Sequence, residues 1–298
     1  MSGGEAALAG LAFCWGASWG SFANVVAWRL PRGVSVVRPG SSCPSCGAPV
    51  PVWANLPVLG WFLVGGACRS CRTPISLRYP LVEAVVGIAA LAIWLDLVAQ
   101  AGPDGAWTAR SPGLEVFVPF VLRTAFVAAL IALTLIDLVW FLLPDSLTLP
   151  LILLGLGAAA ATPLSPTLGE AALGAVLGGA LPALVMVLWL VLTGRDGLGG
   201  GDWKLLAAIG AFLGPTAIPF VLGAGALQGL LTAIMFRRDF AVAELPPLPD
   251  ETAPQEPSGS ADGVPPFMRL AVPFGPFLAL AAFEWLLWGD AILAAARG

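Results

Sequence analysis

Residues 116–136 read VFVPFVLRTAFVAALIALTLI and contain a single charged side chain, that of Arg123. About 20 consecutive apolar residues suffice for an α-helix to cross the roughly 30 Å hydrocarbon core of a bilayer. Seven further segments are also apolar: about 6–28, 80–100, 147–162, 168–193, 203–214, 216–236 and 270–294, of which 203–214 is short and is separated from the next by Gly214-Pro215. The sequence therefore predicts an all-α polytopic membrane protein with about eight transmembrane helices, six or seven being the alternatives.

The composition of the whole chain agrees with this prediction. Hydrophobic residues make up 58% of 298 positions and charged residues 11%, with a mean hydropathy of +0.89. A soluble domain usually carries about 25% charged residues. This apolar composition predicts that membrane lipid surrounds the chain. No basic run indicates a nucleic-acid partner. Because the chain has no histidine, proton chemistry near neutral pH must use carboxylates, cysteines, Lys204 or Tyr79.

The basic residues orient the predicted helices. Cytoplasmic loops of membrane proteins are enriched in Lys and Arg. If the N-terminus lies outside, the inside loops collect eleven of the fourteen bases: Arg29, Arg32, Arg38, Arg69, Arg72, Arg78, Arg195, Lys204, Arg237, Arg238 and Arg269. We therefore expect an inner-membrane protein with both termini outside.

Two segments are not predicted to lie in the membrane. Residues 239–265 are Pro-rich and acidic, a composition that cannot bury enough apolar surface to fold alone, so a flexible cytoplasmic loop is expected. Residues 31–79, called the cysteine loop below, contain Cys43-Pro44-Ser45-Cys46 and Cys68-Arg69-Ser70-Cys71. Two CxxC pairs separated by 21 residues predict a structural zinc site with four cysteine ligands. Disulfides or free thiols are the alternatives, and a cytoplasmic location argues against disulfides.

Two aspartates form the second chemical feature. Asp137 ends the third predicted span, and Asp202 begins the sixth after a glycine-rich run that includes Gly197, Gly199 and Gly201. Charged side chains in a bilayer are costly and usually functional. The predicted topology places both carboxylates at the cytoplasmic edge, where one could serve as a general base for water and the other as a general acid.

Several motifs together resemble the type IV prepilin peptidases, a family of membrane aspartyl peptidases with a GxGD motif. They are, in order, Gly20-Ser21-Phe22-Ala23-Asn24-Val25-Val26 with Arg29-Leu30-Pro31, the two CxxC pairs, Asn55-Leu56-Pro57, Arg78-Tyr79-Pro80-Leu81-Val82-Glu83, Asp137 with Leu143-Pro144-Asp145, Gly197 to Asp202 with Lys204-Leu205-Leu206, and Val272-Pro273-Phe274-Gly275-Pro276-Phe277. The resemblance covers almost the whole chain.

The resemblance implies a bifunctional leader peptidase and N-methyltransferase. Asp137 and Asp202 would be its catalytic aspartates, and prepilins or pseudopilins its substrates. Their basic leader would be removed at the cytoplasmic face, and the new N-terminal residue would be methylated from S-adenosyl-L-methionine. The implied domains are a first helix over 1–30, a zinc-binding, methyltransferase-associated loop over 31–79, and a peptidase domain over 80–298.

Three further residues have open roles. Glu83 could bind the methyl donor or the substrate's new amine, or form an ion pair with Arg78 or an interfacial cap. Asp145 could support the active site or cap the fourth span, and Lys204 could tune the aspartates or anchor the interface. Two functional alternatives also remain: a peptidase without methyltransferase activity, and a zinc-stabilised transporter in which the two aspartates relay protons.

Overall fold

The computed structural model describes residues 3–105, 114–161, 166–194, 200–235 and 273–297. Within these ranges all eight predicted apolar segments are helical: α1 (Gly3–Arg29), α3 (Arg78–Gly105), α4 (Leu114–Trp140), α5 (Asp145–Ala161), α6 (Leu168–Thr193), α7 (Asp202–Leu213), α8 (Ala217–Met235) and α9 (Gly275–Arg297). Three short helices, η1 (Leu30–Arg32), η2 (Val52–Asn55) and α2 (Leu59–Leu63), lie between α1 and α3. The all-α fold class is therefore confirmed. The loop predicted over 239–265 lies outside the described residues, as do Gly197 and Gly199.

Six of the described helices are long and apolar enough to cross a membrane, namely α1, α3, α4, α6, α8 and α9. Helix α5 is a shorter apolar helix of 17 residues, and α7 has 12 residues. At 1.5 Å per residue, α7 is only about 18 Å long. Of the eight predicted spans, six thus have spanning length, and the chain is a multi-pass membrane protein.

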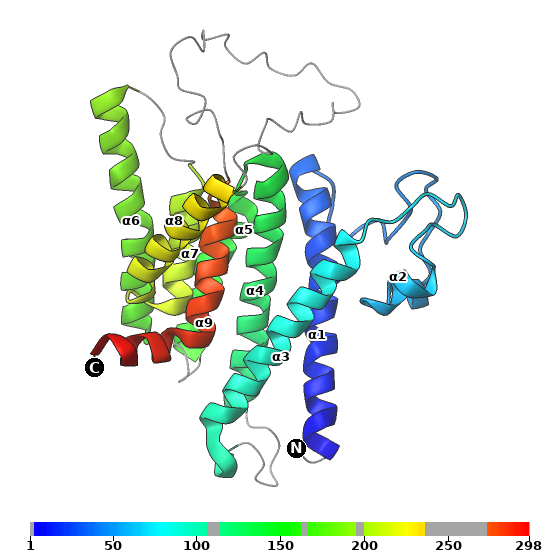
Figure 1. Cartoon of the computed structure of the whole chain (residues 1–298), viewed down its shortest axis with the longest axis horizontal. Coiled ribbons are helices and arrows are strands. Elements are labelled where there is room, and N and C mark those ends of the chain that lie inside the picture. Colours follow the sequence, from blue (N-terminus) through cyan, green and yellow to red (C-terminus); the bar gives the residue numbers. More distant parts are fainter. Residues whose placement is uncertain (1–2, 106–113, 162–165, 195–199, 236–272, 298) are drawn as a thin grey trace.

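The eight helices alternate in direction. Helices α1, α4, α6 and α8 end toward the same side of the bundle at which α3, α5, α7 and α9 begin (Figure 1). The start of α1 and the end of α9 lie toward the other side. Asp137 near the end of α4 and Asp202 at the start of α7 therefore share one side of the bundle.

Helix α7 is enclosed by its neighbours, and nine of its twelve residues are buried. It contacts α5, α6, α8 and α9, and the ring of Phe212 stacks on that of Phe126 in α4 at 4.2 Å. Gly214, with a φ of 81°, ends the helix before Pro215. Burial on all sides explains how so short an apolar helix is stable in the bundle.

Helices α6 and α7 cross at glycines. A Cβ atom on Gly210 of α7 would overlap the carbonyl oxygen of Gly174 in α6, and a Cβ on Gly174 would overlap that of Gly210. Small residues of this kind allow membrane helices to approach closely. The position of α7, and so of Asp202, depends on this crossing.

Two polar pairs connect helices inside the bundle. The Gln228 side-chain amide in α8 donates to both carboxylate oxygens of Glu284 in α9, at 3.0 and 2.9 Å. Arg123 in α4 forms an ion pair with Asp96 in α3 at 3.4 Å. Polar groups inside a membrane are expected to pair in this way.

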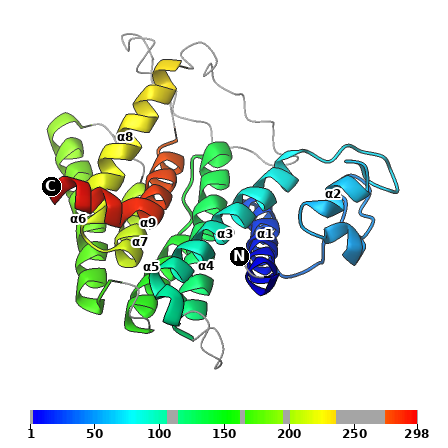
Figure 2. The same cartoon turned by 60° about the horizontal axis from the view of Figure 1, so that its bottom comes forward.

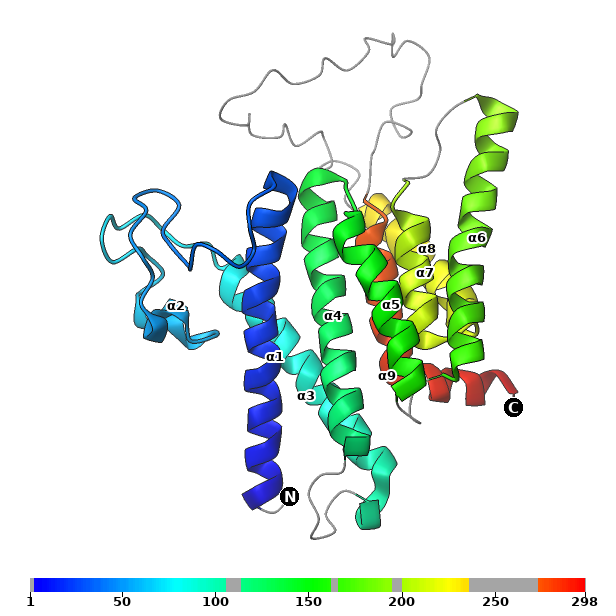
Figure 3. The same ribbon diagram turned by 180° about the vertical axis from the view of Figure 1, so that it is seen from behind.

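The cysteine loop projects sideways from the α1–α3 pair, away from α6 and α8, in all three views (Figures 1, 2 and 3). Arg29 at the end of α1 holds its first segment. The guanidinium donates to the carbonyl oxygens of Ser35, Pro39 and Gly40 at 2.8–3.2 Å. Arg32 lies between the rings of Trp28 and Trp140 at 4.8 and 5.2 Å, which links this junction to the end of α4.

The α6–α7 crossing can be tested with Gly210→Ala. The added methyl has no room, so we expect the free energy of unfolding to fall by about 1–3 kcal/mol, the usual cost of overpacking. Thermal melting of the purified protein in detergent measures the change. Gly223→Ala in α8 is the matched control, because its Cβ meets nothing within 4 Å. Equal melting temperatures for the two variants would contradict the proposed role of the crossing.

Candidate active site and cysteine cluster

Asp137 and Asp202 are two of the few buried charged side chains of the described bundle, with exposures of 5% and 8%. Asp137 lies in the last turn of α4, and Asp202 is the first residue of α7. They are 65 positions apart in the sequence, but their charges are close enough to interact. The structure thus brings together the two acids that the sequence singled out.

Glycines allow the chain to pass close to this pair of aspartates. The Gly275 backbone N–H, at the start of α9, donates to Asp137 Oδ2 at 3.0 Å. A Cβ on Gly275 would lie 2.6 Å from the same oxygen. A Cβ on Gly201 would lie 2.6 Å from the Cβ of Leu143. The N-terminus of α9 therefore orients one carboxylate, while Gly201 lets the chain before Asp202 pack on Leu143.

The sequence indicated Gly275 only through the Val272–Phe277 motif, without a role for it. A backbone N–H that binds a carboxylate 138 positions away leaves no periodic or spacing signal in a single sequence. The contact becomes visible only when α4 and α9 are placed side by side.

Lys204 and Asp145 form an ion pair at the start of α7, close in sequence to Asp202. Lys204 Nζ lies 2.5 Å from Asp145 Oδ1, and the two side chains are 21% and 55% exposed. The bond joins the first residue of α5 to the first turn of α7, two positions after Asp202. The side chain of Asp145 is thus engaged with α7, and Lys204 has a partner that the sequence did not reveal.

The four loop cysteines converge in the structure. Their sulfur atoms all lie within 4.8 Å of one another, and the closest pairs, Cys43–Cys71 and Cys46–Cys68, are 3.7 and 3.9 Å apart. Two thiolates bound 2.3 Å from one tetrahedral metal ion are about 3.8 Å apart. The cluster therefore fits a four-thiolate metal centre.

Each CxxC pair forms the same turn. The N–H of Cys43 donates to Ala48 O and that of Gly47 to Cys43 O, both at 2.9 Å. The second turn repeats this pattern, with Cys68 N donating to Thr73 O and Arg72 N to Cys68 O. Gly47 and Arg72 occupy equivalent left-handed positions, with φ of 69° and 61°. Local turn geometry thus aims the thiols of each pair at one point.

The thiols of the cluster have unequal acidities. Hydrogen bonds from the Thr73 hydroxyl and backbone N–H lower the pKa of Cys71 to about 6. A hydrogen bond from the Ala48 backbone lowers the pKa of Cys46, but hydrogen bonds shared with the thiols of Cys71, Cys43 and Cys68, together with desolvation, outweigh it and raise this pKa to about 11. One thiolate therefore forms readily, and a cation would favour the rest.

Glu83 contacts the cysteine loop. Its Oε2 atom accepts a hydrogen bond from the Val58 backbone N–H at 2.6 Å. Val58, the residue before α2, has a φ of 63°, a rare conformation for a β-branched residue. The guanidinium of Arg78 lies over the Tyr79 ring at 5.7 Å. The partner shown for Glu83 is thus the loop backbone, and no ion pair with Arg78 is seen among the described residues.

The fold and this arrangement of acids define a membrane-embedded aspartyl peptidase class. Residues 14–97 match the bacterial peptidase A24 N-terminal domain, and residues 124–234 match the type IV leader peptidase family. The chain belongs to the type IV prepilin leader peptidase/N-methyltransferase family. The interpretation of the motifs as those of this family of enzymes is confirmed.

Curated relatives cover most of the chain. The prepilin leader peptidase/N-methyltransferase of Aeromonas hydrophila is 34% identical over 319 residues, covering 95% of this chain and 91% of its own. That of Neisseria gonorrhoeae is 37% identical over 243 residues, covering 73% and 78%. That of Pseudomonas aeruginosa is 34% identical over 301 residues, covering 92% and 88%. No solved structure matches this chain.

Gly275→Ala tests the contact with Asp137. The new methyl would lie 2.6 Å from Oδ2 and displace the carboxylate. Because a misplacement of about 1 Å can cost roughly a hundredfold in rate, we expect the peptidase rate to fall by between ten- and a hundredfold. Gly223→Ala serves again as the control. A normal rate for Gly275→Ala would show that α9 does not orient Asp137.

Proposed function

We propose that this chain removes the basic leader of type IV prepilins or pseudopilins, with Asp137 and Asp202 as the catalytic pair. The observation that carries the proposal is the convergence of two buried carboxylates at one side of a membrane bundle. One carboxylate takes a proton from the attacking water, and the other gives a proton to the leaving amine. Two close carboxylates share one proton readily, because ionising both is unfavourable.

The cytoplasmic face is the proposed side of cleavage. Arg29, Arg78 and Lys204 lie in or beside the helix ends that share this side with the two aspartates. An excess of Lys and Arg favours the cytoplasmic side. The cysteine loop and the catalytic pair then face the cytoplasm, and both termini lie outside in an inner-membrane protein.

We assign zinc to the four cysteines. Zinc favours tetrahedral thiolate sites, and the spacing of the sulfur atoms supports this geometry. Without the ion, the loop has few buried apolar side chains to hold it together, since most of its large hydrophobic residues are exposed. The ion's role is structural, keeping residues 31–79 folded beside α1 and α3.

The second proposed activity is N-methylation of the new N-terminal residue. The methyl group of S-adenosyl-L-methionine passes to the amine nitrogen. A C–N bond forms as the sulfonium C–S bond breaks, leaving a neutral thioether, and the amine's proton goes to solvent. Support comes from family membership and from the fused cysteine loop. In the proposed division of the chain, residues 1–30 form the first transmembrane helix, 31–79 the methyltransferase-associated loop, and 80–298 the peptidase domain.

The catalytic pair is tested with Asp137→Asn and Asp202→Asn. Asn keeps the shape of the side chain and removes the acid, so each change should lower prepilin cleavage by at least about a hundredfold. The double variant should be little worse than either single one, because the two groups act as a unit. Cleavage of a purified prepilin, followed by mass spectrometry of its N-terminus, measures the effect.

The control for the catalytic pair is Asp145→Asn, which removes a nearby exposed carboxylate and should cost much less. Methylation of an already cleaved substrate should persist in both aspartate variants. Near-normal cleavage by well-folded Asp202→Asn protein would refute the proposed pair.

Zinc binding is tested with a Cys43→Ser, Cys71→Ser double variant. Metal analysis should find about one zinc per wild-type chain and much less in the variant, because four thiolates are needed for a closed site. Cys14→Ser, outside the loop, is the matched control. The variant should also melt at a lower temperature. Equal zinc contents in the three proteins would rule out the assignment.

A further inference from the structure

Part of the cysteine loop has an apolar surface that no other element of the described chain covers. Residues 39–68 contain no charged side chain, although they lie outside the predicted membrane spans. Large apolar patches on a protein surface mark the sites at which it meets a partner. Six side chains, called the apolar edge below, are 41–87% exposed: Val52, Trp53, Leu56, Leu59, Phe62 and Leu63.

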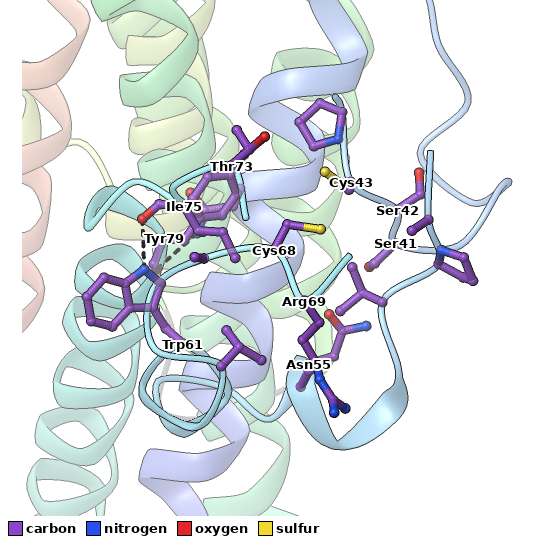
Figure 4. A pocket seen from close by; sticks show the side chains of 18 of the residues that line it. Ser41, Ser42, Cys43, Asn55, Trp61, Cys68, Arg69, Thr73, Ile75 and Tyr79 are labelled. Atoms are coloured by element: carbon purple, nitrogen blue, oxygen red, sulfur yellow. Dashed lines mark hydrogen bonds between the residues drawn. The ribbon is translucent and has the colours of Figure 1, made fainter. Parts of the chain in front are cut away.

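Helix α2 presents one face of the apolar edge outward and packs with its other face. Leu59, Phe62 and Leu63 are three and four positions apart, so they share one side of the helix. On the other side Gly60 is buried, and Trp61 Nε1 donates to a carbonyl oxygen of the loop at 2.9 Å (Figure 4). The loop therefore folds without using the outward face of α2.

The apolar edge lies beside the membrane helices, not beyond their ends. In Figures 1 and 3, α2 lies below the end of α1 and the start of α3, toward the middle of the bundle. The N–H of Val58, the residue before α2, donates to Glu83 at 2.6 Å. Glu83 comes five positions after Arg78, the first residue of α3, which is about 7–8 Å along a helix. Interfacial helices insert to a similar depth, about 5–10 Å.

The apolar edge is next to a surface of the bundle that faces lipid. Leu81, Val85 and Ile88 of α3 are exposed and lie on one side of that helix, four and three positions apart. Helix α3 is long and apolar enough to cross the membrane, and α2 packs against it. Lipid that surrounds α3 therefore also reaches α2.

An aromatic and basic border accompanies the apolar edge. The guanidinium of Arg69 lies over the ring of Trp53 at 4.9 Å, and Arg69 and Arg72 are both exposed. Tryptophan is enriched at the level of the lipid headgroups, and basic side chains attract anionic lipids. The chemistry around the apolar edge thus suits the surface of a bilayer.

We propose that the apolar edge inserts into the membrane leaflet on the side of the two aspartates, at the boundary between headgroups and acyl chains. The occupant of this surface is the bilayer that surrounds the bundle. The loop is then attached to α1 through Arg29, to α3 through Glu83, and to lipid through α2. Lipid contact supplies the apolar burial that the loop lacks by itself. The proposal does not depend on either enzymatic activity.

The test is photo-cross-linking of the full-length protein in nanodiscs of phosphatidylethanolamine and phosphatidylglycerol. Phe62→p-benzoylphenylalanine keeps an aromatic ring on the apolar edge and should form adducts with lipid acyl chains, detected by mass spectrometry. Val37→p-benzoylphenylalanine is the matched control. Val37 is 76% exposed, but it lies in the segment that Arg29 holds at the end of α1. It should give about tenfold fewer lipid adducts, because it lies outside the acyl region.

A Leu59→Asp, Phe62→Asp double variant gives a second measurement. Two charges in place of apolar side chains should release the apolar edge from lipid, so backbone hydrogen exchange of residues 52–63 in nanodiscs should become about tenfold faster. On a surface that faces water, such changes have little effect. Val37→Asp is the control and should leave this exchange unchanged. Zinc content checks that the loop is folded in each variant.

Three results would overturn the proposal. The first is an equal yield of lipid adducts from positions 62 and 37. The second is unchanged hydrogen exchange in the double aspartate variant. The third is an adduct of position 62 with a protein chain in place of lipid, which would show that the apolar edge binds a protein partner.

Discussion

Burying two carboxylates together is the constraint on which the rest of the bundle depends. Charged groups lose hydration in such a place, and two of them repel each other. The chain meets this cost with the Gly275 N–H aimed at Asp137 and with a short, largely buried helix that begins at Asp202. Glycine contacts between α6 and α7 let that helix sit where it does.

The cysteine loop obeys a different physical rule. It has too little apolar burial to fold on a core, and its two CxxC turns instead converge on one point. Arg29 and Glu83 attach the loop to α1 and α3 through backbone groups. The molecule thus has two chemically distinct regions, a bundle organised by buried acids and a loop organised by thiols. A cavity of about 480 Å³ lies where the loop meets the first two long helices.

Several polar side chains inside the bundle are paired, but three buried oxygens of the described residues have no hydrogen-bond partner, those of the Asn24, Thr124 and Gln228 side chains. Gln228 with Glu284 and Arg123 with Asp96 join neighbouring helices, as expected where water is absent. Of the three residues with an unpaired oxygen, Asn24 also lines the cavity beside the cysteine loop. A buried oxygen without a hydrogen-bond partner lowers the stability of the fold.

Local signals in the sequence predicted the helices and the cysteine turns, and they singled out the two acids that the structure brings together. Apolar runs and CxxC spacing are local signals, and helix formation and tight turns are local events. Tertiary structure alone decided the bond of Gly275 to Asp137, the pairing of Lys204 with Asp145, and the contact of Glu83 with Val58. It also showed that α7, whose shortness the sequence already indicated, is enclosed by its neighbours. The three contacts named above join positions far apart in the chain. Their partners depend on how the helices and the cysteine loop pack together, and this packing leaves no periodic pattern in a single sequence.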